Sequence, residues 1–408
     1  MSTHTPQPLR EAGHGILPRP VSFAAVELVF LGVFFATSAF SPFLSFYETE
    51  WHFGIWLVTF AFGIYALALL VALLTVGALS DYLGRRPVLV ISLLLCALSM
   101  VMVMLAPSIG WVIAGRIIQG FATGAATGAI SAGIVELAPR RHHSVGVLLA
   151  SITPPAGQAV GGLITGSVLS LSRNPSLIIF GTLAAVFVVG AALVGLGGET
   201  VSRRPGAARS LIPRVSVPAA SRVAFTASVP VLISTWMTGA FYLGLLPTAA
   251  GPVFHTGGGF ITGLTLTLLN GVGVLTTLAT QRLAPATRAI FGEAVLVVGI
   301  VALAASLSLG SVALLITATC VAGVGYGWAF SGVLGTVLAT GSTRDRAALF
   351  SAIYVVSYLA LGVPAIIAGI AADSLGVLAT AIGYSLIVAI AAAGGLLTQL
   401  RLNGASRR

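Results

Sequence analysis

The stretch that decides the fold is G-A-L-S-D-Y-L-G-R-R-P-V at residues 77–88, which separates two long apolar runs. Each of these runs is long enough to cross a bilayer, so the polar turn between them lies at a membrane surface. Arg85 and Arg86 place that surface on the cytoplasmic side, because short cytoplasmic loops are rich in basic residues. Gly77 and Gly84 permit the sharp reversal of the backbone that the turn requires.

Asp81 is the acid of this turn and lies four residues before Arg85, so the two can pair if the helix continues that far. The pattern resembles the signature loop between the second and third membrane helices of the major facilitator superfamily. The matching residues are Gly77, Leu79, Asp81, Gly84, Arg85 and Arg86. The resemblance implies a carrier whose loop acid fastens two halves together, near the start of helix 11, when the cytoplasmic side is shut.

Composition assigns the chain to the membrane, because 57% of its 408 residues are hydrophobic and only 7% are charged. The basic residues are all arginine, and the net charge of +10 favours loops facing anionic lipid over a nucleic-acid partner. Without lysine the chain can form neither an ATPase phosphate loop nor a retinal Schiff base. The cysteines lie alone in apolar runs and the histidines in tails or loops, so we expect no metal, haem or other cofactor and no enzyme activity.

Apolar runs long enough to span a bilayer occur twelve times, which predicts an all-α membrane protein. They lie at about residues 23–46, 54–80, 87–106, 110–137, 144–171, 177–198, 223–247, 259–282, 288–309, 311–340, 345–372 and 376–400. With both termini cytoplasmic, every arginine except Arg116 and Arg173 falls on the inside, whereas Glu48, Glu50 and Asp373 fall outside. This bias predicts a multi-pass protein of the plasma membrane with that orientation.

A polar stretch at residues 199–221, rich in Arg, Pro, Ser and Gly, divides the helices six and six and predicts a flexible cytoplasmic linker. The predicted organisation is a cytoplasmic tail, an N-terminal bundle, the linker, a C-terminal bundle and a second tail, at residues 1–22, 23–198, 199–221, 222–400 and 401–408. A shift of 203 residues aligns five pairs, which are Gly120/Gly323, Gly124/Gly327, Arg141/Arg344, Gly166/Gly369 and Arg85/Arg288. These matches predict two bundles related by a pseudo-twofold axis. The second copy lacks the loop acid, because Ala284 stands where Asp81 would align.

The fourth apolar run carries a charge, Arg116, in G-R-I-I-Q-G. A charge there is costly unless it faces the bundle interior or water, and a polar stripe continues from it at helical spacing through Gln119, Thr123 and Thr127. Beside the stripe, Gly120, Gly124 and Gly128 form a face suited to close helix packing. The R-x-x-Q-G pattern resembles the second signature of proton-coupled superfamily members, which implies that Arg116 influences protonation of a nearby acid. The alternative is an arginine that reaches outward to the periplasmic interface.

The fifth run matches a third signature only in part. Drug/proton antiporters of the superfamily often show G-x-x-x-G-P-x-x-G-G there, and this chain keeps Gly157, Gly161 and Gly162 but has Gln158 in place of the proline. Pro154 and the following proline supply a kink slightly earlier. The direction of transport therefore stays open.

Candidates for the proton-carrying acid are Glu27 on the first run, Glu293 on the ninth and Glu136 at the cytoplasmic end of the fourth. A carboxylate near a helix end also serves as an interfacial cap or as an ion-pair partner for cytoplasmic arginine. We favour Glu27, because the resemblance implies that helix 1 lines the cavity.

Helices 1, 4, 7 and 10 are expected to form the cavity wall. The candidate lining residues are Phe34, Ser38, Thr123, Thr127, Gln158, Trp236, Thr238, Tyr242, Asn270, Tyr326 and Trp328. Most aromatic residues in a membrane bundle are ordinary packing, but aromatic and hydroxyl groups beside one cation suit a small amphipathic solute, and Arg116 leaves an anion possible.

The sequence thus predicts a carrier, expected to be monomeric, that exports a small organic solute in exchange for protons. Uptake of a metabolite, such as an anion held by Arg116, is the alternative within carriers. A membrane subunit or sensor without transport activity is the alternative of another class, supported by the lost acid at Ala284.

Overall fold

The computed structural model describes residues 15–51, 53–139, 143–213, 215–256, 258–341 and 346–405. Within these ranges the chain contains twelve helical segments that are long and apolar enough to cross a membrane. The prediction of an all-α membrane protein with twelve spans is therefore confirmed.

The N-terminal half holds the first six spans. Its helices are α1 (Arg19–Trp51), α2 (Ile55–Thr75), the short α3 (Ser80–Leu83), α4 (Arg85–Met104), α5 (Ile109–Leu137), α6 (His143–Leu171) and α7 (Pro175–Leu196). Leu105 and Ala106 were predicted to belong to the third span, but α4 ends at Met104, and a short turn precedes α5. The chain then passes through α8 (Ala207–Ser210) into the second half.

The C-terminal half holds the other six spans. Its helices are α9 (Arg222–Ala240), α10 (Leu246–Phe254), α11 (Gly258–Ala279), α12 (Pro285–Leu309), α13 (Val312–Thr340), α14 (Arg346–Leu375) and α15 (Val377–Ala405). The seventh span combines η2 (Ala219–Ser221), α9, a π-helical turn η3 (Phe241–Leu245) and α10.

The π-helical turn in the seventh span has a local cause. Pro247 lacks an N–H group, so the Leu243 carbonyl loses the donor it would have in a regular helix. The Ser41 hydroxyl of α1 donates to that carbonyl at 2.7 Å instead. Neighbouring helices in membrane proteins often satisfy backbone groups freed in this way, and here the neighbour belongs to the other half.

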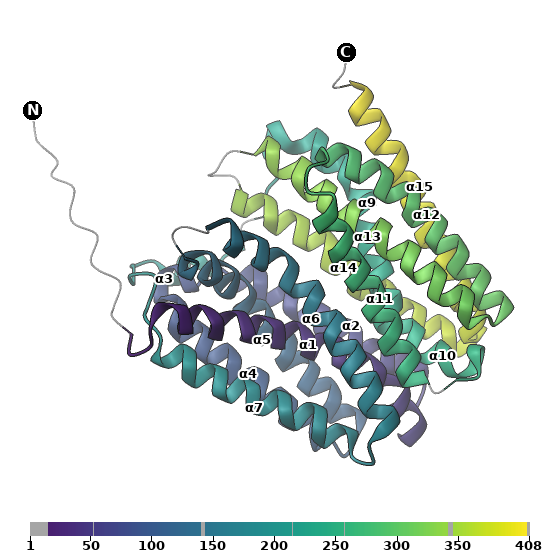
Figure 1. Ribbon diagram of the computed structural model, residues 1–408, viewed down its shortest axis with the longest axis horizontal. Helices are drawn as coiled ribbons and strands as arrows, with labels where there is room; N and C mark the ends of the chain where they lie inside the picture. The colour runs from purple at the N-terminus through teal and green to yellow at the C-terminus, as the bar shows by residue number, and fades with distance from the viewer. Residues whose placement is uncertain are drawn as a thin grey trace, which may run out of the picture.

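Figure 1 shows the two halves as separate bundles, with the purple to teal helices on one side and the green to yellow helices on the other. We call the face where α1 begins and α15 ends the terminal face. It also carries the α2–α4 loop and the polar segment between the halves. The other ends of the spans form the opposite face, which includes the turns between α6 and α7 and between α12 and α13.

The two halves repeat the same helix packing. Gly124 of α5 faces the Leu69 carbonyl of α2, and Gly327 of α13 faces the Gly273 carbonyl of α11, so tightly that a Cβ atom at either glycine would collide with that carbonyl. Equivalent glycines therefore bring equivalent helices together, as the offset of 203 residues predicts.

The repeat extends to the boundary between the halves. Gly166 of α6 contacts Gly259 of α11, whereas Gly369 of α14 contacts Thr59 of α2. Each half thus places the matched glycine against the other half. The pair Arg141/Arg344 lies outside the described residues.

Candidate functional site

The two halves meet along two helix pairs, α2 with α14 and α6 with α11. The backbones approach closely at glycines, where a Cβ atom on Gly63 would lie 2.9 Å from the Gly362 carbonyl and one on Gly162 would lie 3.0 Å from the Gly263 carbonyl. Gly63, Gly162 and the contacts at Thr59 and Gly259 lie at the middle of the spans or nearer the opposite face. These contacts join the halves on the side away from the chain termini.

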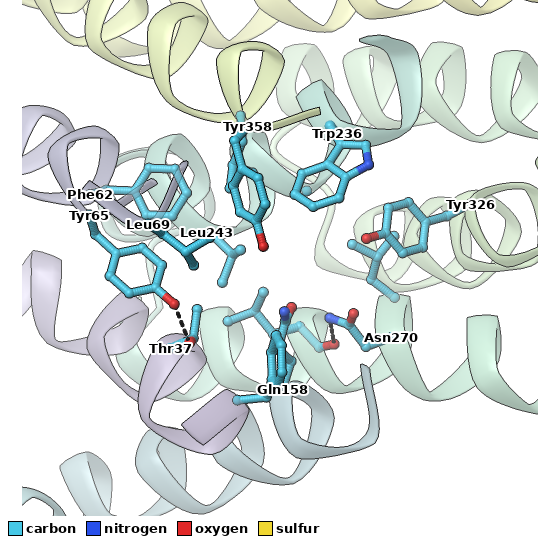
Figure 2. Close-up of a pocket in the computed structure, with 15 residues that line it drawn as sticks. Thr37, Phe62, Tyr65, Leu69, Gln158, Trp236, Leu243, Asn270, Tyr326 and Tyr358 are labelled. Carbon is cyan, nitrogen blue, oxygen red and sulfur yellow. Dashed lines mark hydrogen bonds between the residues drawn. The ribbon is translucent and has the colours of Figure 1, made fainter. Parts of the chain in front are cut away.

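A cavity of about 70 Å³ lies between the halves, lined by residues of both. Figure 2 shows aromatic rings from α2, α9, α13 and α14 converging on it, with amide groups from α6 and α11 below them. The lining residues are Phe34, Thr37, Phe62, Tyr65, Leu69, Gln158, Trp236, Gly239, Leu243, Leu266, Leu269, Asn270, Tyr326, Tyr358 and Leu361. None of these lining residues carries a formal charge, so within the described chain the cavity wall is aromatic, amide and aliphatic.

Hydrogen bonds hold some of the polar lining groups in place. The Tyr65 and Thr37 hydroxyls lie 2.8 Å apart and form a hydrogen bond, and Asn270 Nδ2 donates to the Leu266 carbonyl at 3.1 Å (Figure 2). Asn270 therefore keeps its amide oxygen for another donor, which a solute can supply.

The structure brings five of the predicted cavity residues to the cavity wall, namely Phe34, Gln158, Trp236, Asn270 and Tyr326. The other predicted residues lie elsewhere. They are Ser38, which faces Gly161 of α6; Thr123, buried inside the N-terminal bundle; Thr127, half-buried and bonded within α5; Thr238, bonded within α9; Tyr242, paired with Thr319; and Trp328, which donates to the Thr276 carbonyl. The sequence shows which residues lie near each other along a helix, but it does not show which of them the helix turns toward the cavity.

Sequence reasoning missed three aromatic residues of the wall, Phe62 and Tyr65 on α2 and Tyr358 on α14. These helices were left out of the expected wall, although they form one of the contacts between the halves. Aromatic residues spaced three apart, such as Phe62 and Tyr65, share one helix face and were an available signal.

Arg116 is completely buried in the N-terminal bundle, with an exposed fraction of 0%. Its guanidinium lies between two rings, 4.0 Å from the centre of Tyr65 and 4.4 Å from the centre of Phe40. Nη1 donates to Gln119 Oε1 at 2.6 Å and Nε donates to the Ala61 carbonyl at 3.4 Å, whereas Nη2 has no partner. Two aromatic faces and one amide thus replace the water and the counter-ion that a cation usually keeps.

This geometry corrects two expectations about Arg116. The side chain does not extend to the membrane interface, and it does not line the cavity, because Tyr65 stands between the two. Neither ion pair in the described part of the chain includes Arg116. Glu27 lies about 20 Å away along α1 from Phe40, at 1.5 Å per residue, so the structure does not bring the expected acid to the arginine.

Glu27 and Glu293, two of the acids proposed to carry the proton, lack a cation partner among the described residues. Glu27 of α1 accepts from the Thr153 hydroxyl of α6 and leaves Oε2 unpaired. Glu293 of α12 is completely buried, accepts from the Ser234 hydroxyl of α9 at 2.9 Å and also leaves Oε2 unpaired. Gly395 of α15 makes room for the Glu293 carboxyl group. The ion-pair reading of these acids is therefore wrong for both.

The α2–α4 loop forms a compact charge network at the terminal face. Arg85 pairs with Asp81 and with Glu136 at the end of α5. The helix does not continue between Asp81 and Arg85, because Gly84 has a φ of +100° and separates α3 from α4. That conformation strains any residue with a side chain, which explains the glycine.

Glu199 completes this network and was not predicted. Its carboxylate accepts from the backbone N–H groups of Arg85 at 2.8 Å and Arg86 at 3.2 Å, and so caps the start of α4. The Arg204 N–H also donates to the Tyr82 carbonyl at 2.9 Å. The first part of the segment expected to be a flexible linker is therefore bound to the loop, because helix starts and loop carbonyls leave backbone groups to satisfy.

The remaining predicted loop and packing residues fall at helix contacts. Gly77 lies in the turn after α2, where a Cβ atom would collide with the Leu73 carbonyl. Gly157 and Gly161 of α6 face α1, and Gly162 faces α11 of the other half. Gly157, Gly161 and Gly162 therefore lie where helices approach closely, and their role in transport stays a prediction.

Comparisons with known proteins agree with this geometry. The family described as the Major Facilitator Superfamily matches residues 26–363. The chain is 37% identical over 117 residues to the tetracycline resistance protein, class C, of Escherichia coli, a match that spans 28% of either chain. A bacterial homologue of the human lysosomal transporter Spinster, inward-facing and unoccupied, has the same fold with a TM-score of 0.74 at 13% identity, over 93% of this chain and 97% of that one. A POT family transporter in complex with 5-aminolevulinic acid follows with a TM-score of 0.72 at 10% identity, over 94% and 95%.

Proposed function

Because this chain belongs to the major facilitator superfamily, we propose that it exports a small, uncharged or weakly charged aromatic solute in exchange for protons. The two halves rock about the central cavity, so that the cavity opens to one side of the membrane at a time. The terminal face is cytoplasmic in this proposal, because nearly all arginines fall on that side.

The proposed solute class rests on the composition of the cavity wall. Aromatic rings from both halves offer stacking surfaces, and Gln158 and Asn270 offer amide groups that orient a solute. Arg116 is separated from this space by Tyr65, so the wall favours a neutral or amphipathic molecule over the anion considered from sequence. The relative named for tetracycline resistance supports export.

Proton coupling is supported by Glu27 and Glu293, which lack cation partners in the described residues. Glu293 is completely buried and Glu27 is half-buried. A carboxylate taken out of water without a counter-charge is costly, so burial favours neutralising its charge with a proton or another cation. Uptake and loss of that proton during the cycle would couple the pH gradient to movement of the halves.

Transport in reconstituted vesicles tests the function, with tetracycline as the first probe because a relative is named for it. We expect an imposed pH gradient to drive tetracycline against the proton flow. Movement with the proton flow would indicate uptake. The absence of coupled movement of this probe and of a panel of neutral aromatic dyes would support a membrane subunit without transport activity.

The coupling acids are tested in the same vesicles. Glu293→Gln and Glu27→Gln keep the size of the side chain and its bond to Ser234 or Thr153 while removing the titrating group. We expect the variant at the coupling acid to retain exchange of labelled for unlabelled tetracycline but to lose accumulation driven by the gradient. If both variants keep wild-type accumulation, neither acid carries the proton.

A further inference from the structure

The opposite face is closed by a contact that no sequence signature indicates. Asp373, at the end of α14, reaches across to the start of α2 in the other half. Its carboxylate accepts from the Ile55 N–H at 2.8 Å and from the Trp56 N–H at 3.4 Å. The first N–H groups of a helix have no partner within the helix, so Asp373 caps α2 although it belongs to a different bundle.

The sequence around this cap fits it closely. Gly54 precedes α2, and a Cβ atom there would lie 2.8 Å from Asp373 Oδ2. One turn along the pair, Thr59 packs against Gly369, and further in Gly63 packs against Gly362. Small residues therefore let α2 and α14 approach until the carboxylate reaches the helix start.

An opposing force acts at the same place. Glu48, near the end of α1, lies on the same face as Asp373, and the two carboxylates repel each other when both are ionised. No arginine or histidine forms an ion pair with either acid among the described residues. The closed contact thus combines an attractive cap with a repulsion that favours opening, as expected of a contact that forms and breaks.

The cap is specific to one of the two symmetry-related junctions. A shift of 203 residues places Asp373 on Ser170 of α6, whose hydroxyl donates within its own helix to Gly166. At the terminal face, Asp81 in the loop that follows α2 pairs with Arg85 of its own half in this structure. Of these two aspartates, Asp373 bonds to the other half in this structure, whereas Asp81 bonds within its own half.

We propose that Asp373 is a positioning residue of the transport cycle, which latches α14 to the start of α2 while the opposite face is closed and releases it when that face opens. The inference rests on the proposed alternation between two open sides. In this proposal, Asp373 stabilises the state in which the opposite face is closed. The other end of the α2–α14 pair makes its contacts in the state in which the terminal face is closed.

Distances between spin labels test the latch without any solute. The labels are placed on cysteines at Asn174 and Leu309, exposed on the opposite face of the two halves, and in a second sample at Leu83 and Leu283 on the terminal face. The native cysteines Cys96 and Cys320 are replaced by alanine. We expect Asp373→Ala to raise the ratio of long to short distances at the opposite face on the order of threefold, and to lower it at the terminal face, because one helix cap is lost.

Three further variants make the result specific. Glu48→Gln removes the repulsion and should shift both distributions in the reverse direction. Gly54→Val places a side chain against the carboxylate and should act like Asp373→Ala, which covers the case in which Asp373→Ala fails to fold. Ser374→Ala is the matched control, because Ser374 is exposed and its bond within the described residues is to Ala371 of its own helix.

The latch is wrong if Asp373→Ala and Gly54→Val leave both distributions equal to those of Ser374→Ala. It is also wrong if the two variants broaden the distances at both faces alike, since that indicates a loosened structure rather than a shifted equilibrium. A shift in the expected direction in a protein that moves no tested solute would support the latch and count against the proposed export function alone.

Discussion

Arg116 does not line the cavity, but it contacts a residue that does. Its guanidinium packs against one face of the Tyr65 ring, and this ring forms part of the cavity wall. The Tyr65 hydroxyl forms a hydrogen bond with Thr37. Cation–π contacts that exclude water are worth about 2 kcal/mol each, so two rings offset part of the cost of burying the charge. A residue can thus act on a solute through the group it positions.

In the proposed export of tetracycline, replacement of Arg116 by leucine should weaken binding of the solute about tenfold with a smaller effect on maximal rate, because Tyr65 loses its support. Michaelis constants and maximal rates of exchange in vesicles measure this split. Tyr65→Phe is the matched variant, since it keeps the ring on the guanidinium and loses only the bond to Thr37. Equal Michaelis constants for Arg116→Leu and the wild type would show that the arginine has no influence on the site.

Helix contacts in this protein depend on glycines at defined places more than on hydrophobic side chains. Lipid is as apolar as leucine, so close backbone packing is what favours helix against helix in a membrane. Gly120 and Gly124 of α5 meet α2, and their counterparts Gly323 and Gly327 of α13 meet α11. The same four-residue spacing therefore builds both bundles.

Gly124→Ala should destabilise the protein by about 1–3 kcal/mol, because the added Cβ atom collides with the Leu69 carbonyl. Gly271→Ala on α11 is the control, since no atom lies within 4 Å of a Cβ atom there. Thermal unfolding of the purified variants in detergent compares the two. A midpoint for Gly124→Ala at or above that of Gly271→Ala would contradict the packing argument.

The whole molecule is built to hold its halves together at one side of the membrane at a time. The contacts between α2 and α14 and between α6 and α11 close the opposite face in this structure, while Asp81 at the terminal face bonds within its own half. The resemblance assigns Asp81 to the state in which the terminal face is closed. In that state it fastens the start of the eleventh span, which is α14 here. Residues 342–345, which precede α14, lie outside the described part of the chain.

Asp81→Asn should therefore slow turnover several-fold while leaving the fold intact, because it weakens the state in which the terminal face is closed. Initial rates of tetracycline exchange at saturating probe give the turnover, and the thermal midpoint reports the fold. Arg86→Gln is the control on the same loop, since the described contacts of Arg86 involve its backbone N–H group. Wild-type turnover in Asp81→Asn would remove this residue from the cycle.

The number of spans, the duplication and the compact loop could be predicted because each depends on local properties of the sequence. A run of about twenty apolar residues is long enough to cross a bilayer whatever its neighbours are. Gly84 occupies a left-handed conformation that only glycine adopts readily, and Gly124 and Gly327 mark the same contact in both copies. These features could therefore be predicted from the sequence without knowledge of any tertiary contact.

Only the tertiary structure decided which polar residues meet in the cavity. These helices are apolar on the faces toward lipid and toward protein alike, so hydrophobic periodicity does not show which way a helix is turned. Tyr65 and Tyr358 line the cavity although the sequence did not predict it, whereas Trp328 bonds to α11 instead. Arg116 lies behind Tyr65 and pairs with no acid among the described residues. The cap of Asp373 on α2 likewise joins residues more than 300 positions apart, and packing between the halves alone sets such a pairing.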